Sequence, residues 1–325
     1  MAEAEVGDDV YGEDPTVARL EELSAERMGM EAGLLLPSGT MANQVAIYTH
    51  TRRGDEVSVE AEAHCYYYEV GAMAALAGVQ ARTVAGDRGY VAPQQLAAAV
   101  RPDQLQFPRT RLLCIENTHN RAGGAVIGLE RMQATIGAAR RLGIRVHVDG
   151  ARIFHAQVAT GTPAAELVRG ADSAMFCLSK GLCAPVGSVL VGSKEFIAEA
   201  RKTRKLFGGG MRQAGILAAA GIVALTEMVD RLGEDHQRAR RLAVALAEMG
   251  FAVDPRTCET NMVVMDTEPT GVDGATWVSR LAAAGVQVGA TGPWRLRLVT
   301  HRDVSGPDIE ETIRVFARFA DRKSA

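Results

Sequence analysis

Two short apolar runs in this sequence are each followed closely by a residue with a reactive side chain, an aspartate in one case and a lysine in the other. Residues 146–152 read VHVDGAR and residues 175–181 read MFCLSKG, so that Asp149 ends one strand-like run and Lys180 follows the other. Pyridoxal phosphate requires both residue types: a lysine for a Schiff base and an anion beside its pyridine nitrogen. Strand ends are where an α/β protein places such groups. Taken singly, the aspartate is more often a helix cap and the lysine a solvated side chain. The pair predicts a pyridoxal phosphate site.

Lysine is scarce in this chain, which narrows the choice of a reactive amine. Only Lys180 follows an apolar, strand-like run, whereas Lys194, Lys202, Lys205 and Lys323 lie in polar helical surroundings.

A third segment is suited to a phosphate group. Residues 34–43 place small residues at the start of a helix that continues through Tyr48. Ser38 and Thr40 offer hydroxyls, Gly39 allows close approach, and the amides of a first helical turn favour an anion. A simple serine N-cap is the alternative interpretation of this segment.

Composition and charge exclude several classes of protein. A net charge of -3 and a pI near 6.2 argue against a nucleic-acid partner. Five cysteines without CxxC spacing argue against a disulfide framework or a structural zinc site, and favour the reducing cytoplasm. The acidic first residues are not a signal peptide. The most apolar run, Gly215 to Leu225, is too short to span a membrane and is expected to form a buried helix.

Alternating elements predict an α/β fold with a mainly parallel sheet covered by helices on both faces. Asp14 followed by Pro15 indicates the start of a first helix that reaches Met30. The last two strands are too close for a helical crossover, which allows the final one to run antiparallel. The expected strands are Glu56–Val59, Ala81–Val84, Leu112–Ile115, Ile144–Val148, Ser173–Leu178 and Ser188–Val191.

The pattern changes near residue 231 and predicts a second domain. A long charged helix through Met249 is followed by strands near Phe251, at Met262–Met265 and at Arg295–Val299. We expect a large cofactor-binding domain at 16–230 and a small α+β domain at 231–325. The glycines at 208–210 are expected to form a functional loop inside the large domain, because apolar helical sequence resumes at once.

Seven motifs resemble the low-specificity L-threonine aldolases across nearly the whole chain. They are GDDVYGEDPTV (7–17), LLPSGTMANQ (35–44), ENTHN (116–120), HVDGAR (147–152), LSKGL and APVGS around Lys180, GGGMRQAG (208–215) and RLVTH (297–301). The resemblance implies the fold-type I, aspartate-aminotransferase-like architecture of pyridoxal-phosphate enzymes. It also implies a homodimer or homotetramer with active sites shared between subunits. The implied reaction is retro-aldol cleavage of L-threonine, L-allo-threonine and related β-hydroxy-α-amino acids to glycine and an aldehyde.

The resemblance also implies roles for individual residues. Lys180 resembles the Schiff-base lysine, Asp149 the partner of the pyridinium nitrogen, and Arg152 a residue close to the phenolic oxygen of the cofactor. Ser38, Gly39 and Thr40 resemble the phosphate loop. Lys205 and Arg212 resemble basic residues that reach toward the cofactor site of the neighbouring subunit.

Substrate contacts are implied in the same way. Arg297 resembles the arginine that binds the substrate carboxylate, although an alternating strand residue beside Arg295 could also be solvated. His64 occupies the position of a ring-stacking histidine that could handle the substrate hydroxyl proton; from its sequence context alone it is a helix-start histidine. Tyr11 also falls in a motif, with an interface aromatic as the alternative. Asn43 and Glu116 fall in motifs too, Glu116 with a structural acid as its alternative.

Two departures from the family pattern stand out. Gln106 occupies a substrate-contacting position where many relatives have a histidine, and glutamine cannot titrate near neutrality. Relatives also carry an upstream arm with an Arg-Ser-Asp-Thr segment whose serine helps hold the substrate, whereas this chain opens almost directly at Gly7. Residues 1–15 are therefore expected to form a shortened arm.

Three other functions are compatible with these observations. A β-eliminating lyase or an aminotransferase can be built on the same scaffold. The shortened arm also allows a catalytically impaired homologue.

Overall fold

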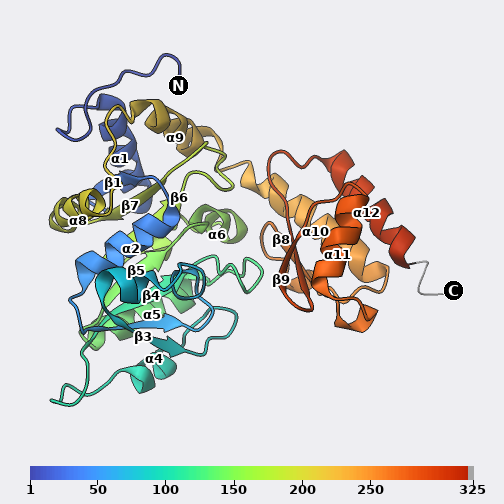
Figure 1. Cartoon of the computed structure of the whole chain (residues 1–325), viewed down its shortest axis with the longest axis horizontal. Coiled ribbons are helices and arrows are strands. Elements are labelled where there is room, and N and C mark those ends of the chain that lie inside the picture. Colours follow the sequence, from blue (N-terminus) through green and yellow to red (C-terminus); the bar gives the residue numbers. More distant parts are fainter. Residues whose placement is uncertain (321–325) are drawn as a thin grey trace. The chain divides into compact units, whose positions relative to one another are not determined.

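The computed structural model describes residues 1–320 and divides into two compact units. The first unit comprises residues 1–120 and 127–229, and the second comprises residues 121–126 together with the chain from Asp230 onward (Figure 1). The short segment 121–126 therefore belongs to the second unit although it lies between two strands of the first. Each unit is described by itself.

The first unit is built on a seven-stranded sheet in the order β1-β7-β6-β5-β4-β2-β3. Strands β3, β2, β4, β5 and β6 are parallel, and β7 is antiparallel to both β6 and β1. The strands are β1 (Ala32–Leu36), β2 (Glu56–Glu60), β3 (Gln80–Val84), β4 (Thr110–Glu116), β5 (Arg145–Asp149), β6 (Ser173–Cys177) and β7 (Ser188–Gly192).

The predicted mainly parallel sheet is confirmed, as are the six predicted strands and the antiparallel direction of the last one. Strand β1 was not predicted. Its short apolar run, which is followed by Pro37, reads equally well as the segment that leads into the next helix. Periodicity cannot distinguish a five-residue buried strand from such a segment.

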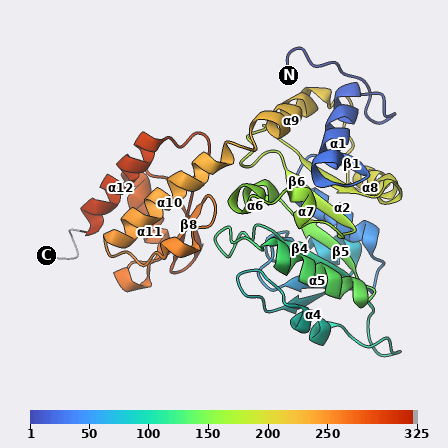
Figure 2. The ribbon, with the colours of Figure 1, turned by 180° about the vertical axis from the view of Figure 1, so that it is seen from behind.

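Helices cover both faces of this sheet. Helices α2 and α8 pack on the face formed by Leu34, Met175 and Leu190, and α2 lies toward the viewer in Figure 1. Helix α7 contacts both α1 and α5 on the other face, and α5 lies toward the viewer in Figure 2. The helices of this unit are α1 (Pro15–Met28), α2 (Gly39–His50), α3 (His64–Tyr67), the π-helix η1 (Met73–Ala77), α4 (Pro93–Ala99), α5 (Leu129–Arg141), α6 (Ile153–Thr160), α7 (Ala164–Leu167), α8 (Lys194–Leu206) and α9 (Gly215–Glu227).

Helix α9 corrects one expectation. Its apolar sequence predicted a buried helix, but Ile216 and Val223 are 44% and 47% exposed. The buried face is lined by small residues, and a Cβ on Gly221 would lie 2.8 Å from a methyl carbon of Leu20 on α1. The apolar run therefore reflects close packing of α9 on α1 along one face. Within residues 1–320, no helix is long and apolar enough to cross a membrane.

The second unit packs helices on a three-stranded antiparallel sheet in the order β8-β10-β9. Its core contains the rings of Phe251, Trp277 and Phe316, with Trp277 stacked on Phe316 at 5.8 Å. The strand expected near Phe251 is reduced to one bridge between Ala252 and Asp266, and β9 was not predicted. The elements are α10 (Leu232–Glu248), the 3₁₀ helices η2 (Pro255–Thr257) and η3 (Glu268–Thr270), β8 (Met262–Asp266), α11 (Gly274–Ala283), β9 (Gly289–Gly292), β10 (Arg295–Val299) and α12 (Gly306–Ala320).

Asp14 joins three segments of the first unit. Its carboxylate caps α1 by accepting from the backbone N–H groups of Thr16 and Val17, at 3.1 and 3.0 Å. It also accepts from the N–H of Gly215, at 2.8 Å, and from that of Gly7, at 3.2 Å. The predicted N-cap is confirmed, and the same side chain holds the amino-terminal segment and the start of α9.

We expect Asp14→Ala to lower the free energy of unfolding by about 3 kcal/mol, because it removes a cap and further charge-assisted hydrogen bonds at a buried site. Urea titration of the full chain would measure this loss. Asp273→Ala is the matched control, since Asp273 caps only its own helix, α11, and its loss should cost less. Equal losses in the two variants would contradict the joining role of Asp14.

Candidate active site

Three strands of the first unit bring chemically capable side chains to one edge of the sheet. Strands β4 and β5 end at Glu116 and Asp149, which are register partners. Strand β6 lies beside β5, and Lys180 follows its last residue by three positions. Because the carboxyl ends of parallel strands meet at the same edge, the predicted acid and the predicted amine lie on neighbouring strand ends.

Asp149 is buried, with 2% of its surface exposed. Its Oδ1 accepts from the backbone N–H of Ala151 at 3.0 Å, and its Oδ2 accepts from the amide of Asn43 at 2.8 Å. A carboxylate offers about four acceptor positions, so these two bonds leave capacity for further donors. A buried anion with acceptor capacity fits the protonated nitrogen of a pyridine ring.

Lys180 is half-buried in the turn after β6, and its carbonyl accepts from the N–H of Cys183 at 2.9 Å. Three other lysines, Lys194, Lys202 and Lys205, are exposed on α8, and Lys323 lies outside the described residues. Lys194 also follows a buried strand, β7, but β7 runs antiparallel to β6 and ends at the opposite edge of the sheet. Within residues 1–320, Lys180 is therefore the lysine that follows the carboxyl end of a buried parallel strand.

The start of α2 approaches the same part of the sheet. A Cβ on Gly39 would lie 2.8 Å from Sγ of Cys177, so only glycine lets the helix come this close to the end of β6. Ser38 caps the helix by accepting from the N–H of Met41 at 3.2 Å, and Thr40 is exposed in the first turn. The hydroxyls and amides of this turn could hold the phosphate of a cofactor.

The glycine-rich loop packs against this helix start. A Cβ on Gly209 would lie 2.2 Å from Sδ of Met41, so residues 208–210 run directly over the first turn of α2. Lys205 borders the loop at Gly210. Arg212 follows the loop, with its guanidinium 5.9 Å from the ring centre of Tyr11. Lys205, Arg212 and Tyr11 are all exposed.

Glu69 belongs to this site and was missed by the sequence analysis. It is 2% exposed and accepts from Nδ1 of His64 at 2.9 Å, from the amide of Gln44 at 2.6 Å and from that of Asn43 at 2.8 Å. Its only sequence signal is an acid directly after three tyrosines. The bond to Nδ1 fixes the His64 ring and leaves Nε2 as the nitrogen available for other contacts.

Electrostatics favour a charged His64. Its pKa is raised, mainly by the hydrogen bond that its Nδ1–H donates to Glu69, with burial acting in the opposite direction and the charges of Asp149 and Glu116 adding to the rise. The backbone N–H of His64 also donates to Glu116 at 2.7 Å. Burial raises the pKa of Glu116. Side-chain atoms of His64, Glu69 and Asp149 lie within 4.8 Å of one another, so this edge concentrates titratable groups.

Arg152 lies close to the same edge, because it follows Asp149 by three residues and precedes the first turn of α6. It is half-buried, and its guanidinium is 3.5 Å from the side-chain oxygen of Asn120.

Gln106 is not brought to these residues within one chain. It lies in an exposed loop before Thr110, the first residue of β4, and therefore at the opposite edge of the sheet from Asp149. Its amide donates to the side-chain oxygen of Gln104 at 3.0 Å.

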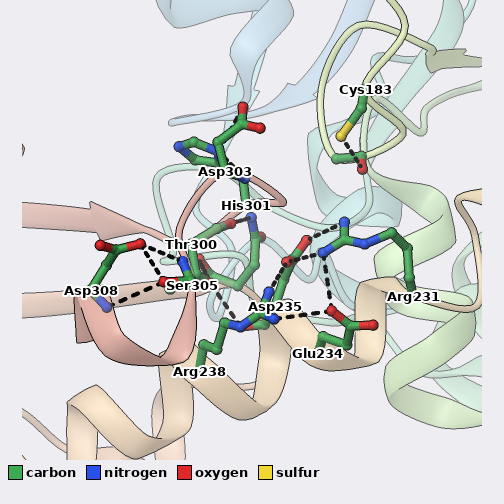
Figure 3. A network of polar contacts seen from close by, with 12 residues as sticks. Cys183, Arg231, Glu234, Asp235, Arg238, Thr300, His301, Asp303, Ser305 and Asp308 are labelled. Atoms are coloured by element: carbon green, nitrogen blue, oxygen red, sulfur yellow. Dashed lines mark hydrogen bonds and ion pairs between the residues drawn. The ribbon is translucent and has the colours of Figure 1, made fainter. Parts of the chain in front are cut away.

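Arg297 belongs to the second unit, where it sits on the central strand β10 opposite Val264 and Gly289. Thr300 directly follows β10 and makes a hydrogen bond to α10. Its Oγ1 donates to the carbonyl of Asp235 at 2.7 Å (Figure 3). Asp235 is fully buried and pairs with Arg231 at 2.8 Å. This network holds the carboxyl end of β10 against α10 within the unit.

Comparisons with known proteins identify relatives over almost the whole chain. The family model described as beta-eliminating lyase matches residues 1–268. The chain is 42% identical over 326 residues to low-specificity L-threonine aldolase 1 of Arabidopsis thaliana, with 97% of this chain and 90% of the relative covered. It is 43% identical over 324 residues to the low specificity L-threonine aldolase of Escherichia coli K12, with 99% and 94% covered.

Solved structures share the fold. Leishmania major threonine aldolase superposes with a TM-score of 0.83 at 18% identity, covering 98% of this chain and 93% of that one. Sphingomonas wittichii serine palmitoyltransferase has a TM-score of 0.78 at 18% identity, covering 98% and 80%. The aspartate aminotransferase of Thermus thermophilus has a TM-score of 0.70 at 20% identity, covering 94% and 82%.

The matched sequence family, together with the shared fold and the strand-end site, defines a pyridoxal-phosphate-dependent enzyme of fold type I. The sequence relatives narrow this class. The chain belongs to the low-specificity L-threonine aldolases, within the beta-eliminating lyase family.

We expect Glu69→Gln to lower the pKa of His64, because the hydrogen bond that His64 donates to the Glu69 carboxylate is the largest cause of its rise. Titration of the His64 ring by NMR would measure the change, with Glu62→Gln as a control that removes a nearby acid. Because the pKa of His64 is raised in the folded protein, the His64–Glu69 contact makes its full contribution to stability when the pH is below the ordinary histidine pKa. This contribution is lost as pH rises through the raised value. An unchanged His64 titration would show that Glu69 does not control the ring.

Proposed function

We propose that this enzyme cleaves L-threonine, L-allo-threonine and related β-hydroxy-α-amino acids to glycine and an aldehyde. The observation that carries the proposal is the placement of Lys180 and Asp149 after neighbouring parallel strands in a chain 42% to 43% identical to low-specificity L-threonine aldolases. Purified protein loaded with pyridoxal phosphate should release aldehyde and glycine in equal amounts from threonine.

Pyridoxal phosphate, when bound, accepts the electron pair released as the Cα–Cβ bond of the substrate breaks. Lys180 would hold the cofactor through its amine until the substrate amine takes its place. Asp149 would accept a hydrogen bond from the pyridine nitrogen and keep that nitrogen protonated. The buried position of Asp149 supports this role, because a charge-assisted hydrogen bond is stronger where water is excluded.

His64 would stack on the cofactor ring and remove the proton of the substrate β-hydroxyl. Its hydrogen bond to Glu69 supports this role, because the bond uses Nδ1 and leaves Nε2 for the substrate. Arg297 would bind the substrate carboxylate, which fixes the rotation about Cα and so selects the bond that breaks. Deprotonation of His64 would then be required for cleavage.

Ser38, Gly39, Thr40 and Arg152 would hold the phosphate and the phenolic oxygen of the cofactor. We further propose that the protein is a cytoplasmic homodimer or homotetramer with shared active sites. The exposure of Tyr11, Lys205 and Arg212 supports a contribution from these side chains to a neighbouring subunit. Gln106, exposed at the other edge of the sheet, could approach a substrate only from a second copy of the chain.

Two related activities are distinguished by their products. A β-eliminating lyase or an aminotransferase would yield an oxo acid instead of glycine and aldehyde. The family model is described as beta-eliminating lyase, which is compatible with β-elimination. The threonine aldolases among the relatives that match over nearly the full length favour retro-aldol cleavage.

We expect Lys180→Ala to abolish turnover, because within residues 1–320 the other lysines lie exposed on α8. Borohydride reduction of the loaded wild-type protein, followed by mass spectrometry, should place the cofactor on the peptide that contains residue 180. Lys202→Ala is the matched control and should keep full activity. A Lys180→Ala protein that cleaves threonine at the wild-type rate would refute the assignment.

We expect Asp149→Asn to lower kcat by about ten- to a hundredfold, because the loss of one charge-assisted hydrogen bond costs about 1.5 to 3 kcal/mol. Steady-state kinetics at saturating cofactor would measure the effect. Asp172→Asn is the control, since Asp172 precedes β6 at the other edge of the sheet. Unchanged turnover in Asp149→Asn would remove Asp149 from the proposed site.

A further inference from the structure

A continuous series of hydrogen bonds leads from Asp149 into the interior of the first unit. Successive bonds measure 2.8 Å from Asp149 to Asn43, 3.1 Å to Nε2 of His147, 2.9 Å from Nδ1 of His147 to Ser173, and 2.8 Å to Nε2 of His50. Every member is at most 7% exposed. The roles proposed above account only for Asp149.

The fold places these five side chains in one row. Asn43 and His50 lie seven residues apart on α2, two helical turns that return to the same face. His147 and Ser173 are register partners on β5 and β6, and His147 precedes Asp149 by two, so both point to the same side of the strand. The row therefore runs between α2 and the sheet.

The direction of the bonds follows from the chemistry of Asn43. Its amide nitrogen lies 2.8 Å from a carboxylate oxygen of Asp149 and 2.8 Å from one of Glu69. Only an NH₂ group, with one N–H for each acid, is compatible with two carboxylates. The side-chain oxygen of Asn43 therefore faces His147, whose Nε2 must carry the donated proton.

The remaining directions follow by counting protons. Burial lowers the pKa of His147 to about 4, so the neutral ring has only one N–H, and its Nδ1 accepts from the hydroxyl of Ser173. That hydroxyl has no second proton, so Ser173 accepts from Nε2–H of His50. The pKa of His50 is also lowered, mainly by burial. Every bond in the series donates toward Asp149.

The far end of the series lies at the opposite edge of the sheet. His50 stacks on Phe196 at 4.3 Å and lines a cavity of about 700 Å³ that also includes Arg145 and Asp172, which lie at the start of β5 and just before β6. The stacking on Phe196 holds the His50 ring in place, and Nε2–H of His50 is the first donor of the series.

We propose that His147, Ser173 and His50 are positioning residues, which lock Asn43 with its amide toward Asp149 and Glu69 and so hold the Asp149 carboxylate in place for the cofactor nitrogen. The inference rests on the proposed role of Asp149. Asn43 in turn connects Asp149 to Glu69, and through Glu69 to His64. A change at Ser173, two bonds from Asn43, is therefore transmitted to the cofactor site.

Ser173→Ala tests the proposal in the full-length, cofactor-loaded protein. Ser173→Ala removes two bonds of the series, to His147 and from His50. We expect the dissociation constant of pyridoxal phosphate to rise and kcat for threonine to fall, each by about two- to tenfold, because the effect reaches the cofactor site only through Asn43. KM for threonine should stay within about twofold, because the series does not reach a carboxylate-binding arginine. Ser24→Ala is the matched control: Ser24 is equally buried, and its hydroxyl donates to the carbonyl of Leu20 at 2.7 Å on α1. Identical behaviour of the two variants would overturn the proposal.

Two further measurements separate this role from a general packing effect. His147→Gln keeps an acceptor toward Ser173 and a donor toward Asn43 and should retain more cofactor affinity than His147→Leu. In wild-type protein labelled with ¹⁵N-histidine, the His147 ring should be neutral with its proton on Nε2 at pH 7. A proton on Nδ1, or a charged ring, would overturn the proposal. If instead Asp149→Asn left cofactor binding and turnover unchanged, the proposed role of Asp149 would fail, while the NMR result would still decide the direction of the series.

Discussion

Two buried carboxylates held by one amide are the constraint on which the carboxyl edge of the sheet depends. Asp149 and Glu69 have oxygens within 4.8 Å of each other, where two unit charges repel by roughly 3 to 4 kcal/mol at an effective dielectric constant near 20. Asn43 offsets this repulsion because it gives one N–H to each acid. Glu69 also contacts His64, and Asp149 is the proposed partner of a cofactor nitrogen, so a single amide sets the distance between these two acids.

Helix α2 carries most of this arrangement, and its position depends on a glycine. Without a Cβ at Gly39, the helix approaches β6 until its first turn lies beside the strand that leads to Lys180. The same placement puts Asn43 beside Asp149 one turn later and His50 beside the far edge of the sheet. The proposed phosphate site, the placement of the buried acids and the interior row of hydrogen bonds are therefore consequences of one close helix–strand contact.

The fold is shared with solved structures of low sequence identity, whereas the reaction is indicated by relatives of higher sequence identity. Solved structures of a threonine aldolase, a serine palmitoyltransferase and an aspartate aminotransferase share this fold at 18% to 20% identity, so the fold alone is compatible with several reactions. The sequence relatives at 42% and 43% identity decide among them. Glu69 and His64 lie at the carboxyl ends of the parallel strands, and their contact would orient the proposed base.

The sequence by itself determined those features that depend on local patterns, namely the strand-end residues and the start of the first helix. Lys180 and Asp149 were identifiable because each follows an apolar run, and Asp14 because a cap precedes Pro15 at the start of a periodic helix. Only the tertiary structure decided that Glu69 supports His64 and that Gln106 lies at the edge away from Asp149. A hydrogen bond between residues 26 or 106 positions apart leaves no periodic trace in the chain, since its geometry exists only after helices have packed on the sheet.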